Sequence, residues 1–114
     1  MNKIKDHIDN IRREAMRDID PNRASLLLQN LSALLGSVSD QWIEAEMDYN
    51  RLYEQMTNKY EKVSEARAKA KASEQYEIKL KQEALLSVTK ELMNALKYVL
   101  KVKMEEIKDS RYMT

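Results

Sequence analysis

The chain has 114 residues, enough for one domain and too few for a second independent core. It has one glycine and one proline, so it lacks the turn residues that a sheet-rich fold requires, and its 43% apolar content excludes a disordered tail. A formal net charge of +1 excludes a bulk field that attracts nucleic acid or anionic lipid, and the absence of cysteine excludes disulfides. We therefore expect one all-α domain over residues 1–114, located in a reducing compartment, the cytoplasm.

A short helix is expected over residues 1–19, where apolar residues recur every three or four positions. A helix of this length is marginally stable alone, so we expect it either to dock or to remain partly disordered. Asp20 and Pro21 then end it, because proline disfavours a helical residue before it and is favoured at the first helical position; we expect a new helix to start at Pro21 with Asp20 as its N-cap. The stripe consists of Ile4, Ile8, Ile11, Ala15 and Ile19.

A long amphipathic helix is predicted over residues 21–60 from ten turns of apolar periodicity. Gly36 lies inside it and costs about 1 kcal/mol relative to alanine, which a close helix crossing or, alternatively, a local bend would offset. We expect the chain to turn at a corner within residues 58–66, with Ser64 as a possible cap. The buried seam comprises Ala24, Leu27, Leu31, Leu34, Val38, Trp42, Ala45, Tyr49, Leu52, Met56 and Tyr60.

A second long helix is predicted over residues 65–109, forming an antiparallel hairpin with the first. Small residues at 66, 70 and 73 would permit close helix packing. Between residues 84 and 104 apolar side chains cover two sides, and a helix of this kind usually contacts two neighbours. A hairpin alone buries little core, so we expect a second subunit to complete a helical bundle, most simply as a two-fold dimer. The expected oligomer interface comprises Leu85, Val88, Leu92, Leu96 and Val99.

The sequence has few residues of the types that catalysis requires. We therefore expect that the protein is not an enzyme and has no catalytic residue and no cofactor. His7 is the sole histidine, which excludes Cys–His pairs, serine–histidine triads and two-histidine zinc sites. Asp40, Glu44 and Asp48 share one helical face and could hold a hard cation, but one helix offers too few ligands, and a solvated face is the preferred interpretation. No metal site is therefore expected.

Aromatic residues occur at helical spacing in the first long helix. Trp42, Tyr49, Tyr53 and Tyr60 could line a ligand pocket, but this spacing is more typical of seam residues whose polar tips reach the edge. We therefore expect them in the core.

A row of lysines is the best candidate for an electrostatic site. Lys90, Lys97, Lys101 and Lys108 are spaced by seven, four and seven residues, so they share one face of a helix. Aligned lysines can follow a phosphate backbone, which makes them candidate nucleic-acid-binding residues. Glu91, Glu105 and Glu106 lie close by, so a hydrated helix face is the competing interpretation.

Several short stretches have a recognisable pattern: residues 30–36 (NLSALLG), Tyr49-Asn50, residues 64–70 (SEARAKA) and Leu96-Lys97-Tyr98. Together they resemble small helical proteins of phages and prophages, which are often encoded among early genes for DNA replication and recombination. The resemblance covers residues 25–105. It implies a phage origin, an early accessory role in the host cytoplasm, and no defined functional residue.

Three functions remain open. The leading hypothesis is a non-enzymatic, homo-oligomeric accessory protein that binds DNA or a DNA-handling partner. The second is an inhibitor that binds a host enzyme such as an antiviral defence complex, and the third is a structural or scaffolding protein. No segment is apolar and long enough to span a membrane, so no membrane partner is expected.

Overall fold

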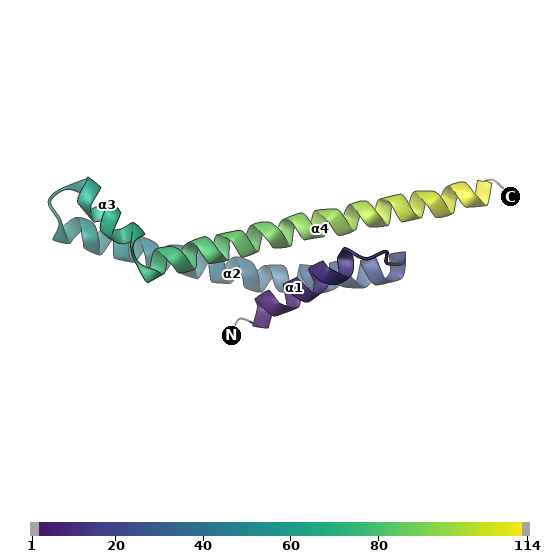
Figure 1. Cartoon of the computed structure of the whole chain (residues 1–114), viewed down its shortest axis with the longest axis horizontal. Helices are drawn as coiled ribbons and strands as arrows, with labels where there is room; N and C mark the ends of the chain where they lie inside the picture. The colour runs from purple at the N-terminus through teal and green to yellow at the C-terminus, as the bar shows by residue number, and fades with distance from the viewer. Residues whose placement is uncertain (1–2, 113–114) are drawn as a thin grey trace. The chain divides into compact units, whose positions relative to one another are not determined.

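The computed structural model describes residues 3–112 of the chain. The helices, in order, are α1 (Lys3–Ala15), α2 (Pro21–Lys59), α3 (Val63–Lys71) and α4 (Glu74–Tyr112) (Figure 1). Within the described residues there is no strand, which confirms the predicted all-α class. The two long helices, α2 and α4, pack together, with side chains of both in the buried core.

Contacts divide the chain into two compact units, both built on α2 and α4, although one domain was expected. Unit 1 comprises Met1–Gly36 with Ser87–Thr114, and unit 2 comprises Ser37–Leu86. The physical reason is that each 39-residue helix meets different neighbours along its length. In unit 1 the short helix α1 packs with parts of α2 and α4, whereas in unit 2 the short helix is α3.

Unit 1 has a core to which all three of its helices contribute. Ile8 and Ile11 of α1 are buried, so the predicted amphipathic helix docks as its stripe requires. Burying such a side chain contributes about 1.5–3 kcal/mol. Thr89, a polar residue, also occupies a core position, which the apolar pattern did not predict. The other core residues of unit 1 are Ala24, Leu27, Leu31, Leu92 and Leu96.

Unit 2 has a smaller core that relies on close helix approach. Val38, Ala45 and Tyr49 of α2 are buried, and so are Ala66 and Ala70 of α3. The two alanines lie four residues apart on one face of α3, where the absence of bulk lets helix backbones come close. Their burial agrees with the expectation of tight packing at this stripe.

The predicted seam of α2 is confirmed along its whole length. Each of the eleven seam positions from Ala24 to Tyr60 is buried or half-buried. Asp20 caps the helix as expected, because its Oδ1 accepts a hydrogen bond of 2.8 Å from the backbone N–H of Arg23. The helix therefore begins at Pro21, the predicted residue.

Two predicted helix boundaries and one predicted cap were wrong. The first helix ends at Ala15 instead of residue 19; residues 16–20 are not helical, and proline disfavours a helical conformation for the residue before it. The expected helix over residues 65–109 is divided into α3 and α4 at Ala72 and Ser73. Ser73 Oγ accepts a hydrogen bond of 3.1 Å from the N–H of Tyr76, so serine caps α4 here, whereas Ser64 caps nothing.

The corner after α2 lies where it was expected. Residues 60–62 separate α2 from α3, within the predicted segment 58–66. Lys62 stands in extended conformation at the N-terminus of α3 and makes no side-chain cap. The chain therefore turns here without glycine or proline.

Gly36 does not sit at a close helix crossing, which corrects that expectation. A Cβ built at this position would meet no atom within 4 Å, and the residue is exposed. Its φ is not positive, so any residue could adopt its backbone conformation. The cost of a helical glycine is therefore not offset by packing.

Candidate functional site

The four lysines of α4 lie on the side of the helix that points away from the core of unit 1. Lys90, Lys97, Lys101 and Lys108 are all exposed, as the spacing predicted. At about 100° per residue, the buried Leu92 lies about 160° around the helix from Lys90. We call these four residues the lysine face. Their ammonium groups are free to contact an anionic partner from solvent.

Tyr98 stands beside the lysine face and is unusually accessible. Its side chain is 68% exposed. It follows Lys97 directly in the sequence and precedes Lys101 by three residues, and residues three apart are neighbours on a helix surface. Tyr98 was not among the predicted site residues, although a helical projection places it next to the lysines.

Charge around the lysine face is mixed. Unit 1 has twelve Lys and Arg against nine Asp and Glu, a formal charge of +3, whereas unit 2 has eight against ten, a charge of −2. The slight positive charge of the whole chain is thus concentrated in the unit that bears the lysine face. Acidic residues on α4 nevertheless moderate the local potential: Glu91, Glu105, Glu106 and Asp109.

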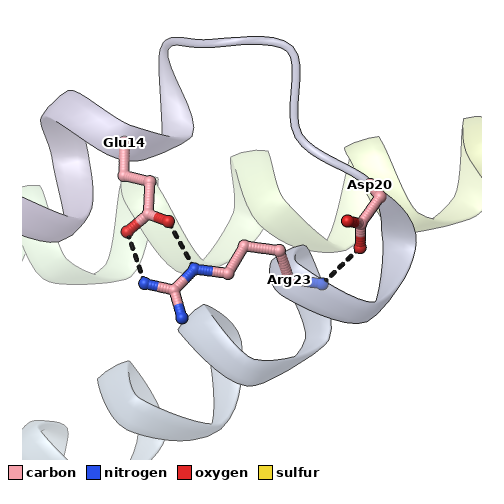
Figure 2. Close-up of polar contacts among 3 residues, drawn as sticks. All are labelled: Glu14, Asp20 and Arg23. Atoms are coloured by element: carbon pink, nitrogen blue, oxygen red, sulfur yellow. Dashed lines mark hydrogen bonds and ion pairs between the residues drawn. The ribbon is translucent and has the colours of Figure 1, made fainter.

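A bidentate ion pair fixes α1 against the start of α2. The guanidinium of Arg23 donates from Nε to Oε1 of Glu14, and from Nη2 to Oε2 at 2.8 Å (Figure 2). The hydrogen bond from Arg23 lowers the pKa of Glu14, against an opposing effect of desolvation. Figure 2 also shows Asp20 capping the same helical turn, so the corner between the helices is held by adjoining polar contacts.

A second ion pair joins α4 to the connection between α1 and α2. Lys103 Nζ lies 3.1 Å from Asp18 Oδ1, and the hydrogen bond to Asp18 raises the pKa of Lys103. Lys103 follows Leu92, Leu96 and Val99 along the same side of α4. The apolar seam of α4 therefore ends in a lysine whose charge is directed to the α1–α2 connection.

The expected oligomer interface is only partly available. Leu92 and Leu96 are 9% and 1% exposed, so their side chains are already buried within the chain itself. They are buried because the third helix of unit 1, α1, shares the core with them. Leu85, Val88 and Val99 are half-buried.

Two residues of the expected interface line a groove between α1 and α4. It lies within unit 1, and Val88 and Leu92 line it on the α4 side together with Glu91 and Ala95. Arg12, Ala15 and Met16 line it on the α1 side. The groove is therefore apolar along its floor and carries one charge of each sign.

The acidic face of α2 lies in unit 2 and is a solvated surface. Asp40, Glu44 and Asp48 line a shallow hollow with Ile43 and Met47, which are 48% and 50% exposed. Arg51 lines the same hollow and pairs with Asp48 at 3.4 Å. Within residues 3–109, no group of three or more His, Asp or Glu side chains is arranged to hold a metal ion.

The aromatic residues of unit 2 pack as a cluster. The Tyr49 and Tyr76 rings lie 5.2 Å apart between centroids, and Lys79 Nζ lies 4.7 Å from the centroid of Tyr49. Burial, with a further contribution from Tyr76, raises the pKa of Tyr49. Trp42 is half-buried, and its Nε1 is buried without a hydrogen-bond partner in the described residues. These contacts favour the core interpretation over a ligand pocket.

His7 is exposed. It lines an open hollow between α1 and α2, whose other walls include Ile11, Leu27 and Leu34. No acid or nucleophile of a catalytic set accompanies it there, because the Glu14 carboxylate is occupied by Arg23.

Comparisons of the chain with protein-family models, with curated proteins and with solved structures gave no significant match. Of the helices in the described part of the chain, none combines the length and the apolar character needed to cross a membrane.

Proposed function

We propose that this chain is a non-enzymatic helical interaction protein that binds nucleic acid through the lysine face of α4. The role that accords with this binding is that of an accessory protein in phage DNA replication or recombination, in the host cytoplasm. The two long helices would form an antiparallel hairpin, and self-association would complete the bundle. The observation that carries the proposal is the exposure of four aligned lysines beside an exposed tyrosine.

The chemistry favours single-stranded nucleic acid. Lysines at seven- and four-residue spacing lie about 10 and 6 Å apart along a helix, so they can contact successive phosphates of a flexible strand. Tyr98 offers an accessible ring, and stacking of a base on an aromatic side chain contributes about 1–3 kcal/mol. A single strand can offer an unstacked base face to that ring, whereas in a duplex the base faces are stacked on one another inside the helix.

Titration of labelled oligonucleotides, followed by fluorescence anisotropy at low salt, tests the proposal. We expect single-stranded DNA to bind more tightly than duplex, and the variant Lys97→Glu/Lys101→Glu to weaken binding by about tenfold or more. Lys69→Glu/Lys71→Glu is the matched control, because it makes the same change of net charge on exposed lysines of α3 in unit 2. Absence of binding at about 100 µM protein, the weak limit of non-specific binding, would remove the proposal.

A protein partner is the second candidate, and the acidic face of α2 favours it. Ile43 and Met47 are half exposed between carboxylates, a surface suited to a basic partner such as a host defence enzyme. Pull-down from nuclease-treated host lysate tests this function. A stoichiometric host enzyme that Ile43→Ser/Met47→Ser no longer retains would favour inhibition over nucleic-acid binding.

A further inference from the structure

Met16 is the most exposed of the large apolar side chains among the described residues. It is 82% exposed, directly after the last residue of α1. An isolated exposed methionine needs no explanation, but Met16 borders an apolar groove whose other lining includes Ala15, Val88 and Ala95. Apolar surface thus continues from the floor of the groove to its rim, and this continuous surface is suited to contact with another molecule.

The groove carries opposite charges on its two sides. Arg12 stands on the α1 side and Glu91 on the α4 side, and both are exposed. Among the described residues neither takes part in an ion pair, whereas Glu14 and Asp18 nearby are already occupied by Arg23 and Lys103. A partner that covers the groove must therefore present a negative charge opposite α1 and a positive charge opposite α4.

We infer that a second copy of this chain covers the groove, with a two-fold axis running along it. Rotation about such an axis places α1 of one copy opposite α4 of the other. Arg12 of each copy then faces Glu91 of its partner, and Met16 of each meets the apolar floor of the other groove. The surface is thus self-complementary in both charge and apolar character, as a two-fold interface requires.

This contact rests on the self-association included in the proposed function, and it is compatible with the lysine face. At about 100° per residue, Ala95 lies about 140° around α4 from Lys90 and about 160° from Lys97. Covering the groove consequently leaves the lysines in solvent. The closed dimer carries two lysine faces, so it would bind a long strand more tightly than the monomer does.

Charge exchange tests the contact sharply. Arg12→Glu and Glu91→Arg should each weaken self-association about 10- to 100-fold, because each change makes both symmetry-related pairs repulsive. Equimolar mixing of the two variants restores opposite charges at both pairs, as does the double variant Arg12→Glu/Glu91→Arg within one chain. The measurement is mass by light scattering and sedimentation across a concentration series, with circular dichroism to verify folding. A monomeric mixture or an unaffected single variant would overturn the two-fold contact.

Met16→Ser tests the apolar part of the same contact. It should weaken self-association, whereas Met104→Ser, which alters another exposed methionine of unit 1 outside the groove, should not. Both variants are also titrated with single-stranded DNA oligonucleotides short enough to occupy one lysine face. A monomeric wild-type protein that binds DNA contradicts the two-fold contact alone. A dimer with the predicted charge behaviour that binds no DNA contradicts the nucleic-acid function and leaves the contact standing.

Discussion

Lys103 Nζ lies 3.1 Å from the carboxylate oxygen of Asp18, a residue 85 positions earlier in the chain. This pair joins α4 to the connection between α1 and α2, and thereby helps to hold all three helices of unit 1 in register. Asp18→Asn should produce a small loss of thermal stability, because the pair is accessible to solvent. The raised pKa of Lys103 means that the pair's contribution is present below the unfolded lysine pKa of about 10.4 and is lost as pH rises through the folded value. The difference in Tm between wild type and variant should therefore be constant from neutral pH and vanish at strongly alkaline pH. An unchanged difference there would contradict the assignment.

The pair of Glu14 and Arg23 should show the opposite pH dependence. Its hydrogen bond lowers the pKa of Glu14, so its contribution is present above the unfolded pKa of about 4.3 and is lost as pH falls through the folded value. Glu14→Gln should consequently weaken the docking of α1 at neutral pH and have no effect in strong acid. Hydrogen exchange of the α1 amides measures this, with Glu44→Gln in unit 2 as the control. Equal effects of the two variants would show that Glu14 acts only through net charge.

Gly36→Ala should stabilise the protein. No atom lies within 4 Å of a Cβ at this position, and its backbone is compatible with alanine. We expect the free energy of unfolding in urea to rise by about 0.5–1 kcal/mol, because alanine loses less backbone entropy in a helix. Ala45→Gly, made in the buried part of the same helix, should lower it. Destabilisation by Gly36→Ala would mean that a neighbour approaches Gly36 after all.

Leu96→Ala distinguishes a core residue from an interface residue. Because Leu96 is 1% exposed within its own chain, its truncation should lower the free energy of unfolding by about 2–5 kcal/mol. Lys97→Ala, at the adjacent exposed position, should change it by less than about 0.5 kcal/mol. If Leu96→Ala dissociated an oligomer without lowering the stability of the folded chain, Leu96 would belong to an interface instead.

Much of the fold could be predicted from periodicity. The stripe of the first helix and the seam of α2 repeat every three or four residues, and the same residues are buried or half-buried in the structure. The division between α3 and α4 could not be read in this way, because Ala72 and Ser73 are both tolerated inside a helix. The cap that Ser73 provides for Tyr76 is decided by local geometry that the residue types alone do not specify.

The candidate site was predicted less completely. Helical spacing placed the four lysines on one face, and all four are exposed. Spacing could not decide which apolar side of α4 faces the chain's own core, so Leu92 and Leu96 were assigned to a partner. The contributions of Met16, Arg12 and Tyr98 depend on which surfaces remain uncovered after folding, and only the packed structure provides that information.

Salt dependence of binding to single-stranded DNA tests the lysine face most directly. Each lysine that neutralises a phosphate contributes about −0.7 to the slope of log K against log salt concentration. Lys97→Ala/Lys101→Ala should therefore bind more weakly at low salt and reduce the steepness of that slope by about 1.4 relative to wild type. Equal affinities and parallel slopes for the two proteins would contradict nucleic-acid binding through α4.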